Sequence, residues 1–138
     1  MSEMREPSAP IWIPKEVVIA LHARQLAEHG GGEGIRDEGM LESALARPEQ
    51  LFAYGDPPPD LCALSAAHAF GIARNHAFVD GNKRTAYVIM RLFLLRNGMD
   101  ITATKEDRYH TTLALAAGEY TAEAFAAWLR DNTAALEG

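Results

Sequence analysis

The sequence predicts an all-α domain, a compact helical bundle with at most a minor two-stranded ribbon. Along most of the chain, apolar residues recur at the three- and four-residue spacing of amphipathic helices. Glycines, prolines and capping residues divide the chain into segments of helical length. The 138 residues suit a single domain over residues 1–138, and a hydrophobic content of 48% is enough to build its core.

The expected helices follow one another along the chain. They cover Pro14 to about His29, Asp37–Arg47, Leu61–Asn75, Asn82–Asn97, Lys105–Ala117 and a last helix capped by Thr121. Residues 1–9 are expected to form a loose tail. Pro14 suits a first helical turn because its missing N–H has no helical partner there. Asp60 is a candidate N-cap, and the second helix is expected to stop before Pro48.

The helix over 82–97 is predicted to be central and most buried, because apolar residues cover more than one of its faces. Two short apolar segments, Ile11–Ile13 and Met99–Ala103, are candidate strands for a ribbon. Cys62 is the only cysteine, so an internal disulfide is excluded and a buried apolar role is expected.

The net charge of −6 argues against a broad nucleic-acid-binding surface, which needs an excess of basic residues. We therefore expect no direct DNA binding by this chain alone. The polar start is not that of a signal peptide, and no apolar run reaches the ~18 residues that span a bilayer. These features predict a cytoplasmic protein without a membrane partner.

The segment HAFVDGNKRTA, residues 76–86, breaks a local rule of helix electrostatics. If Asn82 caps the following helix, Lys83 and Arg84 occupy its first turn, where the helix dipole is already positive. A bound anion would relieve this conflict, because backbone N–H groups and both cations would hold a phosphate there. Gly81 would let the backbone approach closely, and Asn82 has an amide to donate.

Two further side chains in this segment suggest transfer of a phosphorus group from a nucleotide to a hydroxyl. Asp80 supplies the type of oxygen ligand that Mg²⁺ shares with phosphates. His76 is suited to act as a general base near neutral pH. The alternative is that His76 only caps the preceding helix and that Lys83 and Arg84 are solvated cations.

The segment resembles the active-site motif of the Fic/Doc family and is closest to the Doc branch, whose pattern is H-x-F-x-D-x-N-K-R-T-A. The similarity extends to GGGEGIRDEG at 30–39, to LESALARP and to the helix end at 113–118. It implies a small helical bundle that is the toxin of a toxin–antitoxin pair. It also implies an ATP- and Mg²⁺-dependent kinase that phosphorylates a Ser/Thr hydroxyl of a translation factor, elongation factor Tu in the best-known member, and so inhibits translation. The expected partner is a small antitoxin whose C-terminal segment docks in a groove.

The resemblance also implies roles for individual residues. His76 would be the catalytic base and Asp80 the Mg²⁺-associated acid, while the anion-holding loop would comprise Gly81, Asn82, Lys83 and Arg84. Arg74 matches a family arginine near the site. The glycine-rich loop would form a flap near the substrate.

Other functions stay open at this point. Fic enzymes that transfer AMP carry a second glycine where Lys83 stands and a further arginine where Tyr87 stands, so this chain favours the kinase branch. However, Gly81 is typical of the Fic loop, which keeps nucleotidyl transfer as an alternative. A second alternative is a catalytically inactive module that only binds an anion or an antitoxin. A DNA-binding helical domain is a third alternative, and the net negative charge argues against it.

The remaining candidate residues have plainer interpretations. His22 and His29 share a helix face, and an exposed surface is expected there rather than a metal site. His68 is expected to be a hydrogen-bonded histidine of the core or of a groove. Arg91 lies two turns beyond Arg84 and is expected to serve a surface or a partner.

Overall fold

The computed structural model describes residues 9–136, and within them the predicted all-α fold is confirmed. The elements are α1 (Lys15–His29), α2 (Glu38–Tyr54), α3 (Leu61–Asn75), α4 (Asn82–Arg96), β1 (Met99–Ile101), α5 (Lys105–Ala116), α6 (Ala122–Asp131) and β2 (Thr133–Ala135). Of the predicted tail, only Ala9 falls within this range. None of the helices in the described range has the length and apolar character needed to cross a bilayer.

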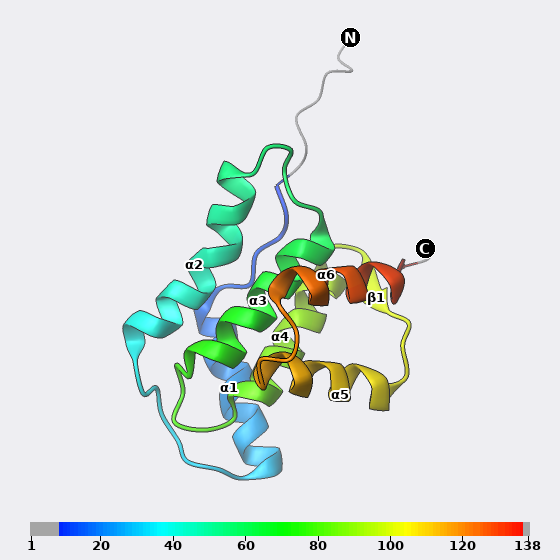
Figure 1. Cartoon of the computed structure of the whole chain (residues 1–138). Coiled ribbons are helices and arrows are strands. Elements are labelled where there is room, and N and C mark those ends of the chain that lie inside the picture. The colour runs from blue at the N-terminus through cyan, green and yellow to red at the C-terminus, as the bar shows by residue number, and fades with distance from the viewer. Residues whose placement is uncertain (1–8, 137–138) are drawn as a thin grey trace.

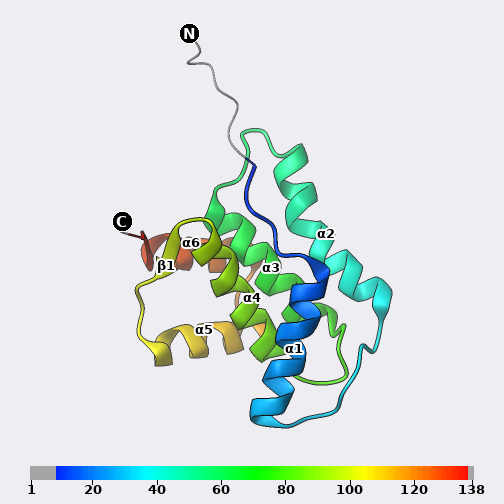
Figure 2. The same ribbon diagram turned by 180° about the vertical axis from the view of Figure 1, so that it is seen from behind.

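The centre of the fold is the pair α3 and α4, which lie side by side with α1 and α2 on one flank and α5 and α6 on the other (Figure 1). The view from behind shows the same arrangement (Figure 2). α4 was predicted to be the central helix, and α3 shares that position because it packs against α2, α4, α5 and α6. Alanines such as Ala66, Ala69 and Ala73 are buried in α3 and allow these neighbours to approach closely.

Two apolar clusters fill the bundle, one on each flank of the central pair. The first joins α1 and α2 to α3 and α4, and its members include Val18, Leu41, Leu64, Ile72, Phe78, Ile89 and Phe93. The second joins α5 and α6 to the same two helices, and its members include Ala69, Met90, Leu94, Leu115, Phe125 and Leu129. The loop between α3 and α4 is therefore anchored in the core through Phe78.

The prediction that the second helix stops before Pro48 is wrong, because α2 continues through this residue to Tyr54. Proline removes one backbone donor and disturbs the preceding turn, which usually ends a helix. Here Pro48 is buried on the face of α2 that also buries Leu41 and Ala44. The extra turns place Phe52 against the first core cluster, so packing offsets the lost hydrogen bond.

The two-stranded ribbon exists, but one of its predicted strands is wrong. β1 pairs antiparallel with β2, so that Asp100 lies opposite Ala134. The segment Ile11–Ile13 is not a strand. The backbone N–H and C=O of Ile11 bond instead to the side chain of Asn97 at 2.8 and 3.0 Å. Trp12 packs against Phe93, with ring centroids 5.8 Å apart.

Four of the helices begin with a side-chain cap. The capping residues Asp37, Asp60, Thr104 and Thr121 each accept a hydrogen bond from the backbone N–H three residues later. The predicted caps Asp60 and Thr121 are thus confirmed. The predicted cap Asn82 is wrong, because α4 follows Gly81 and starts without a side-chain cap.

Candidate active site

The loop that carries the histidine motif is short and starts from a strained residue. α3 ends at His76, whose φ of 52° and ψ of 47° are those of the left-handed region. Within the described range, His76 is the one non-glycine residue with positive φ. This conformation costs roughly 1–2 kcal/mol for a residue with a side chain, and such strain is concentrated at functional sites. His76 is exposed, and its carbonyl accepts a hydrogen bond of 2.8 Å from Arg36 Nε.

Asn82 fixes the shape of this loop from the first residue of α4. Its Oδ1 accepts a hydrogen bond from Phe78 N at 3.1 Å, and its Nδ2 donates to Phe78 O at 3.0 Å. The Asn82 side chain is buried, in line with this internal role. Asn82 therefore holds Phe78 of the loop in place from the first position of α4, rather than capping this helix.

The start of α4 combines the positive end of the helix dipole with two cationic side chains. Its first turn contains no acidic residue and receives no side-chain cap. The first backbone N–H groups of any α-helix have no partner within the helix, so they are available to a ligand. Lys83 and Arg84 are exposed in this turn, and neither forms an ion pair within residues 9–136. Gly81 precedes them with φ of 79°, a left-handed turn that glycine adopts without strain.

Asp80 stands beside this helix start with its carboxylate held by backbone donors. Oδ1 accepts a hydrogen bond from Gly81 N at 2.8 Å, and Oδ2 accepts a longer one from Gly32 N at 3.4 Å. A Cβ atom added at Gly31 would lie 2.9 Å from Asp80 Oδ2, so the glycine-rich loop needs a residue without a side chain here. Asp80 is exposed, so its carboxylate is accessible to solvent.

The donor set around Asp80 fits one kind of metal better than others. No cluster of three or more His, Cys, Asp or Glu side chains occurs in the described part of the chain. A protein cage for zinc or calcium is therefore not formed by those residues. A single carboxylate beside a positively charged helix start suits Mg²⁺, which takes its other ligands from phosphate oxygens and water.

The glycine-rich loop, residues 30–37, runs antiparallel to the loop between α3 and α4, residues 76–81. Ile35 forms an isolated β-bridge with Phe78, and Val79 N donates to Gly34 O at 3.1 Å. On the other side of this bridge, Arg36 N and Asp37 N both donate to Ala77 O, at 2.7 and 3.0 Å. The segment that was expected to lie near the substrate is therefore hydrogen-bonded to the loop that carries His76 and Asp80.

The sequence interpretation of His22 as an exposed residue is wrong, and this residue braces the site. His22 is 4% exposed, and its ring stacks on Phe78 with centroids 3.7 Å apart. Its Nε2 lies 2.7 Å from the Asp80 carbonyl, which only accepts, so Nε2 is the donor. The sequence did contain a signal for the burial of His22: it lies four residues after Val18, and both residues face the core from α1.

Arg74 lies in the last turn of α3, and its guanidinium is directed toward Phe70 and the end of α5. Its guanidinium carbon is 5.5 Å from the centre of the Phe70 ring, a cation–π distance. A Cβ atom at Gly118 would lie 3.3 Å from Arg74 Nη1, which places the guanidinium next to the end of α5. Arg74 therefore contacts the helix end at 113–118 whose sequence also resembles the family.

His68 and Arg91 have structural roles. The predicted core role of His68 is confirmed, because it is 2% exposed and its Nδ1 bonds to Leu64 O at 2.9 Å. Burial lowers the pKa of His68 to about 4, so the ring is neutral at physiological pH. Arg91 was expected to serve a surface or a partner, but it forms a two-pronged ion pair with Asp100 of β1 at 3.0 and 3.2 Å.

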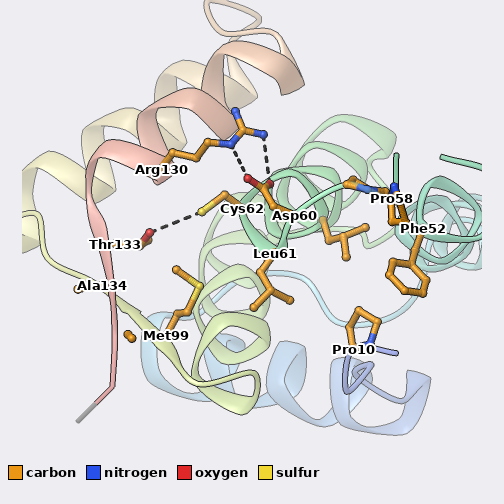
Figure 3. A pocket seen from close by; sticks show the side chains of 13 residues that line it. Pro10, Phe52, Pro58, Asp60, Leu61, Cys62, Met99, Arg130, Thr133 and Ala134 are labelled. Atoms are coloured by element: carbon orange, nitrogen blue, oxygen red, sulfur yellow. Dashed lines mark hydrogen bonds and ion pairs between the residues drawn. The ribbon is translucent and has the colours of Figure 1, made fainter. Parts of the chain in front are cut away.

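One cavity of the described structure lies away from the histidine motif. Its volume is about 690 Å³, and residues from the α2–α3 loop, the start of α3 and the ribbon line it (Figure 3). Arg130 pairs with Asp60 at its rim, and Cys62 Sγ lies 3.5 Å from Thr133 Oγ1. Because Asp60 and His76 flank opposite ends of α3, this cavity and the motif are separated by about 22 Å of helix.

Comparison with known proteins finds a family match that includes the histidine motif. The sequence model of the Fic/DOC family matches residues 12–94, which include α1, the glycine-rich loop and the histidine motif. Protein kinase doc of Escherichia phage P1 is 36% identical over 118 residues, which cover 86% of this chain and 92% of the relative. Toxin Doc of Mycolicibacterium smegmatis is 48% identical over 75 residues, 54% of this chain and 57% of the relative. This chain therefore belongs to the Fic/DOC family as a Doc-type member.

Proposed function

We propose that this chain is the toxin of a toxin–antitoxin pair and acts as an ATP- and Mg²⁺-dependent protein kinase. Its acceptor is a Ser/Thr hydroxyl of a translation factor of the elongation factor Tu type, so the reaction inhibits translation in the cytoplasm. The observation that carries the proposal is the first turn of α4, which has no side-chain cap, carries the exposed Lys83 and Arg84, and directly follows the loop that runs from His76 to Gly81. The names of the two relatives, a protein kinase and a toxin, support the same function.

The residues of the site divide the reaction between them. The helix start, Lys83 and Arg84 bind the terminal phosphates of ATP and stabilise the negative charge on the transferred group. His76 accepts the proton of the acceptor hydroxyl, while the oxygen of that hydroxyl forms a bond to the γ-phosphorus. The bond from the γ-phosphorus to the bridging oxygen breaks, and ADP leaves with the electron pair.

Asp80 is the residue that would hold Mg²⁺, together with phosphate oxygens of the nucleotide. When bound, the ion supplies charge neutralisation for the phosphates. The protein fixes Asp80 through Gly81 N and Gly32 N, and His22 holds the backbone carbonyl of the same residue. The carboxylate is thus oriented before any ligand arrives, which lowers the entropy lost on binding.

Labelled ATP tests the reaction directly. We expect label from the γ-phosphate to reach the translation factor with the wild-type chain and transfer to fall by a factor of about 100 or more in His76→Ala, since a general base contributes 10²–10⁴-fold. The matched control is His110→Ala, which removes an exposed histidine of α5 outside the motif. Equal transfer by wild type and His76→Ala would contradict the role of His76.

Transfer of AMP is the second candidate, and Gly81 is the observation that favours it, because the family's Fic loop carries glycine there. Lys83 and Tyr87 favour phosphate transfer instead. The intact mass of the modified target separates the two reactions, since a phosphate and an AMP group differ greatly in mass. Label that arrives only from the α-phosphate would replace the kinase proposal with AMP transfer. Growth arrest that persists in His76→Ala would support an inactive binding module.

The toxin role requires a partner that restrains it, and we propose a small antitoxin with an amphipathic C-terminal segment. A groove of about 590 Å³ between α2, α3 and α6 suits such a segment, since Leu51 and Tyr54 are 43% and 85% exposed beside it. Leu51→Asp should weaken neutralisation by the co-expressed antitoxin, while Leu136→Asp, at a leucine of similar exposure elsewhere, should not. Unchanged neutralisation in Leu51→Asp would exclude this groove.

A further inference from the structure

The carbonyl end of α3 is bound by one arginine of the glycine-rich loop. Figure 1 shows this loop, between α1 and α2, passing beside the loop that follows α3. Arg36 Nε donates to His76 O at 2.8 Å, and Arg36 Nη2 donates a longer hydrogen bond to Asn75 O at 3.5 Å. Arg36 N donates to Ala77 O at 2.7 Å. A single residue therefore binds three successive carbonyls at the point where the helix ends.

These carbonyls need a donor from outside the helix. The last carbonyls of an α-helix have no partner within it, and they form the negative end of the helix dipole. A guanidinium suits this end, because it is a cation with several donors in one fixed plane. Arg74 lies in the same helix turn but is directed toward Phe70 and the end of α5. Arg36 is thus the cation that bonds to the end of α3 within the described residues.

The start of α2 and the end of α3 are also joined by bonds that do not use the Arg36 side chain. Asp37 is the N-cap of α2, and its Oδ1 accepts a hydrogen bond from Met40 N at 3.0 Å. Asp37 N donates to Ala77 O at 3.0 Å, and Asn75 Nδ2 donates to Met40 O at 3.1 Å. The two helices therefore remain connected when the guanidinium is removed, so its role can be separated from that of the fold.

We propose that Arg36 is a positioning residue, which holds the backbone of His76 in the conformation that presents the imidazole to the acceptor hydroxyl. This inference rests on the proposed function, in which His76 is the general base. With φ of 52°, His76 has a conformation that a residue with a side chain rarely adopts. The guanidinium binds the carbonyl of this same residue. Without that bond, a share of the molecules relaxes to the common conformations with negative φ, in which the imidazole points elsewhere.

Two measurements on Arg36→Ala in the full chain test this role. The first is NMR of His76, because its Cα chemical shift and the coupling between its amide and α protons both report φ. Both should move from left-handed values toward those of a mixed population. The second is γ-phosphate transfer in a single turnover at saturating ATP and acceptor. This rate should fall about tenfold, the effect of losing a hydrogen bond from a charged donor. The concentrations of ATP and acceptor that give half the maximal rate should stay within about twofold of the wild type, since Arg36 binds neither in this role.

Guanidinium ions supply a readout that a purely structural role would not give. Millimolar guanidinium chloride should restore part of the transfer rate of Arg36→Ala, because the ion can take the place of the missing side chain. An equal concentration of sodium chloride should not restore it. The matched control is Arg96→Ala, which removes an exposed arginine from the last turn of α4. Its His76 signals and its transfer rate should equal those of the wild type, with or without guanidinium.

The outcomes distinguish this inference from the proposed function. Unchanged left-handed signals of His76 in Arg36→Ala would overturn the inference, whatever the transfer rate. An unchanged maximal rate with a raised requirement for acceptor would also overturn it, since Arg36 would then bind the acceptor. The proposed function fails separately if the wild type transfers no γ-phosphate, and the NMR comparison still decides in that case whether Arg36 fixes His76.

Discussion

Three histidines in this chain have the same chemistry and different functions because their surroundings differ. His68 lies among Leu64, Trp12 and Phe93 and is a neutral core residue, as its place on the apolar stripe of α3 predicted. His76 follows the same helix and is exposed in a strained turn. The role of His22 could not be predicted, since its partners Phe78 and Asp80 lie far away in sequence.

The hydrogen bond from His22 to Asp80 should control the order of the loop between α3 and α4. His22→Phe keeps a ring to stack on Phe78 but removes the donor, so the part-buried carbonyl of Asp80 loses its partner. We expect a loss of about 1–2 kcal/mol in the free energy of unfolding and faster amide hydrogen exchange at residues 79–81. Phosphate transfer should fall several-fold. The control is His110→Phe, and unchanged exchange in His22→Phe would show that the bond does not hold the loop.

His68 should make the stability of the fold depend on pH. Burial lowers its folded pKa to about 4, against 6.5 when unfolded, so between these values the unfolded chain binds more protons. The stabilisation is full above pH 6.5 and is lost as the pH falls toward 4, by about 3 kcal/mol. Urea unfolding at several pH values measures this slope. In His68→Gln the slope over this window should flatten, and an unchanged slope would assign the effect to other groups.

At the level of elements, the helices were predicted well because helix caps and apolar periodicity depend only on residues that are close in sequence. α3 has the predicted bounds, and the caps Asp60 and Thr121 are in place. Predictions failed where distant contacts decide. Packing carries α2 through Pro48, and the partner of β1 comes from Thr133–Ala135 near the end of the chain. The close contact of Gly31 with Asp80 likewise depends on the fold.

The approach of the glycine-rich loop to Asp80 should make Gly31 sensitive and Gly30 tolerant. Both residues have positive φ, 128° and 78°, so an alanine is strained at either position by at least about 1 kcal/mol. Only at Gly31 does the new Cβ meet the Asp80 carboxylate, at 2.9 Å. Gly31→Ala should therefore raise the Mg²⁺ concentration needed for half-maximal transfer several-fold, whereas Gly30→Ala should not. An equal effect of both substitutions would point to backbone strain alone.

On the scale of the whole molecule, the bundle separates stability from chemistry along the length of α3. The end after Asn75 carries the histidine motif, to which the fold adds His22 and the glycine-rich loop. The sequence predicted residues 76–84 as a candidate site because they are contiguous, whereas the contacts that His22 of α1 makes with Phe78 and Asp80 became visible only in three dimensions. The opposite end of α3 carries Asp60, which joins α6 through Arg130 at 2.6 and 3.1 Å.

This separation predicts that loss of the Asp60–Arg130 ion pair lowers stability slightly and leaves the reaction unchanged. Arg130 lowers the pKa of Asp60, so the stabilisation is present above pH 3.8 and is lost as the pH falls below it. Since both side chains are about half exposed, we expect less than about 1 kcal/mol. Asp60→Asn is the sharpest variant, because asparagine still caps α3. Thermal unfolding and γ-phosphate transfer measured together check this, and a loss of transfer in Asp60→Asn would mean that the two ends of α3 are coupled.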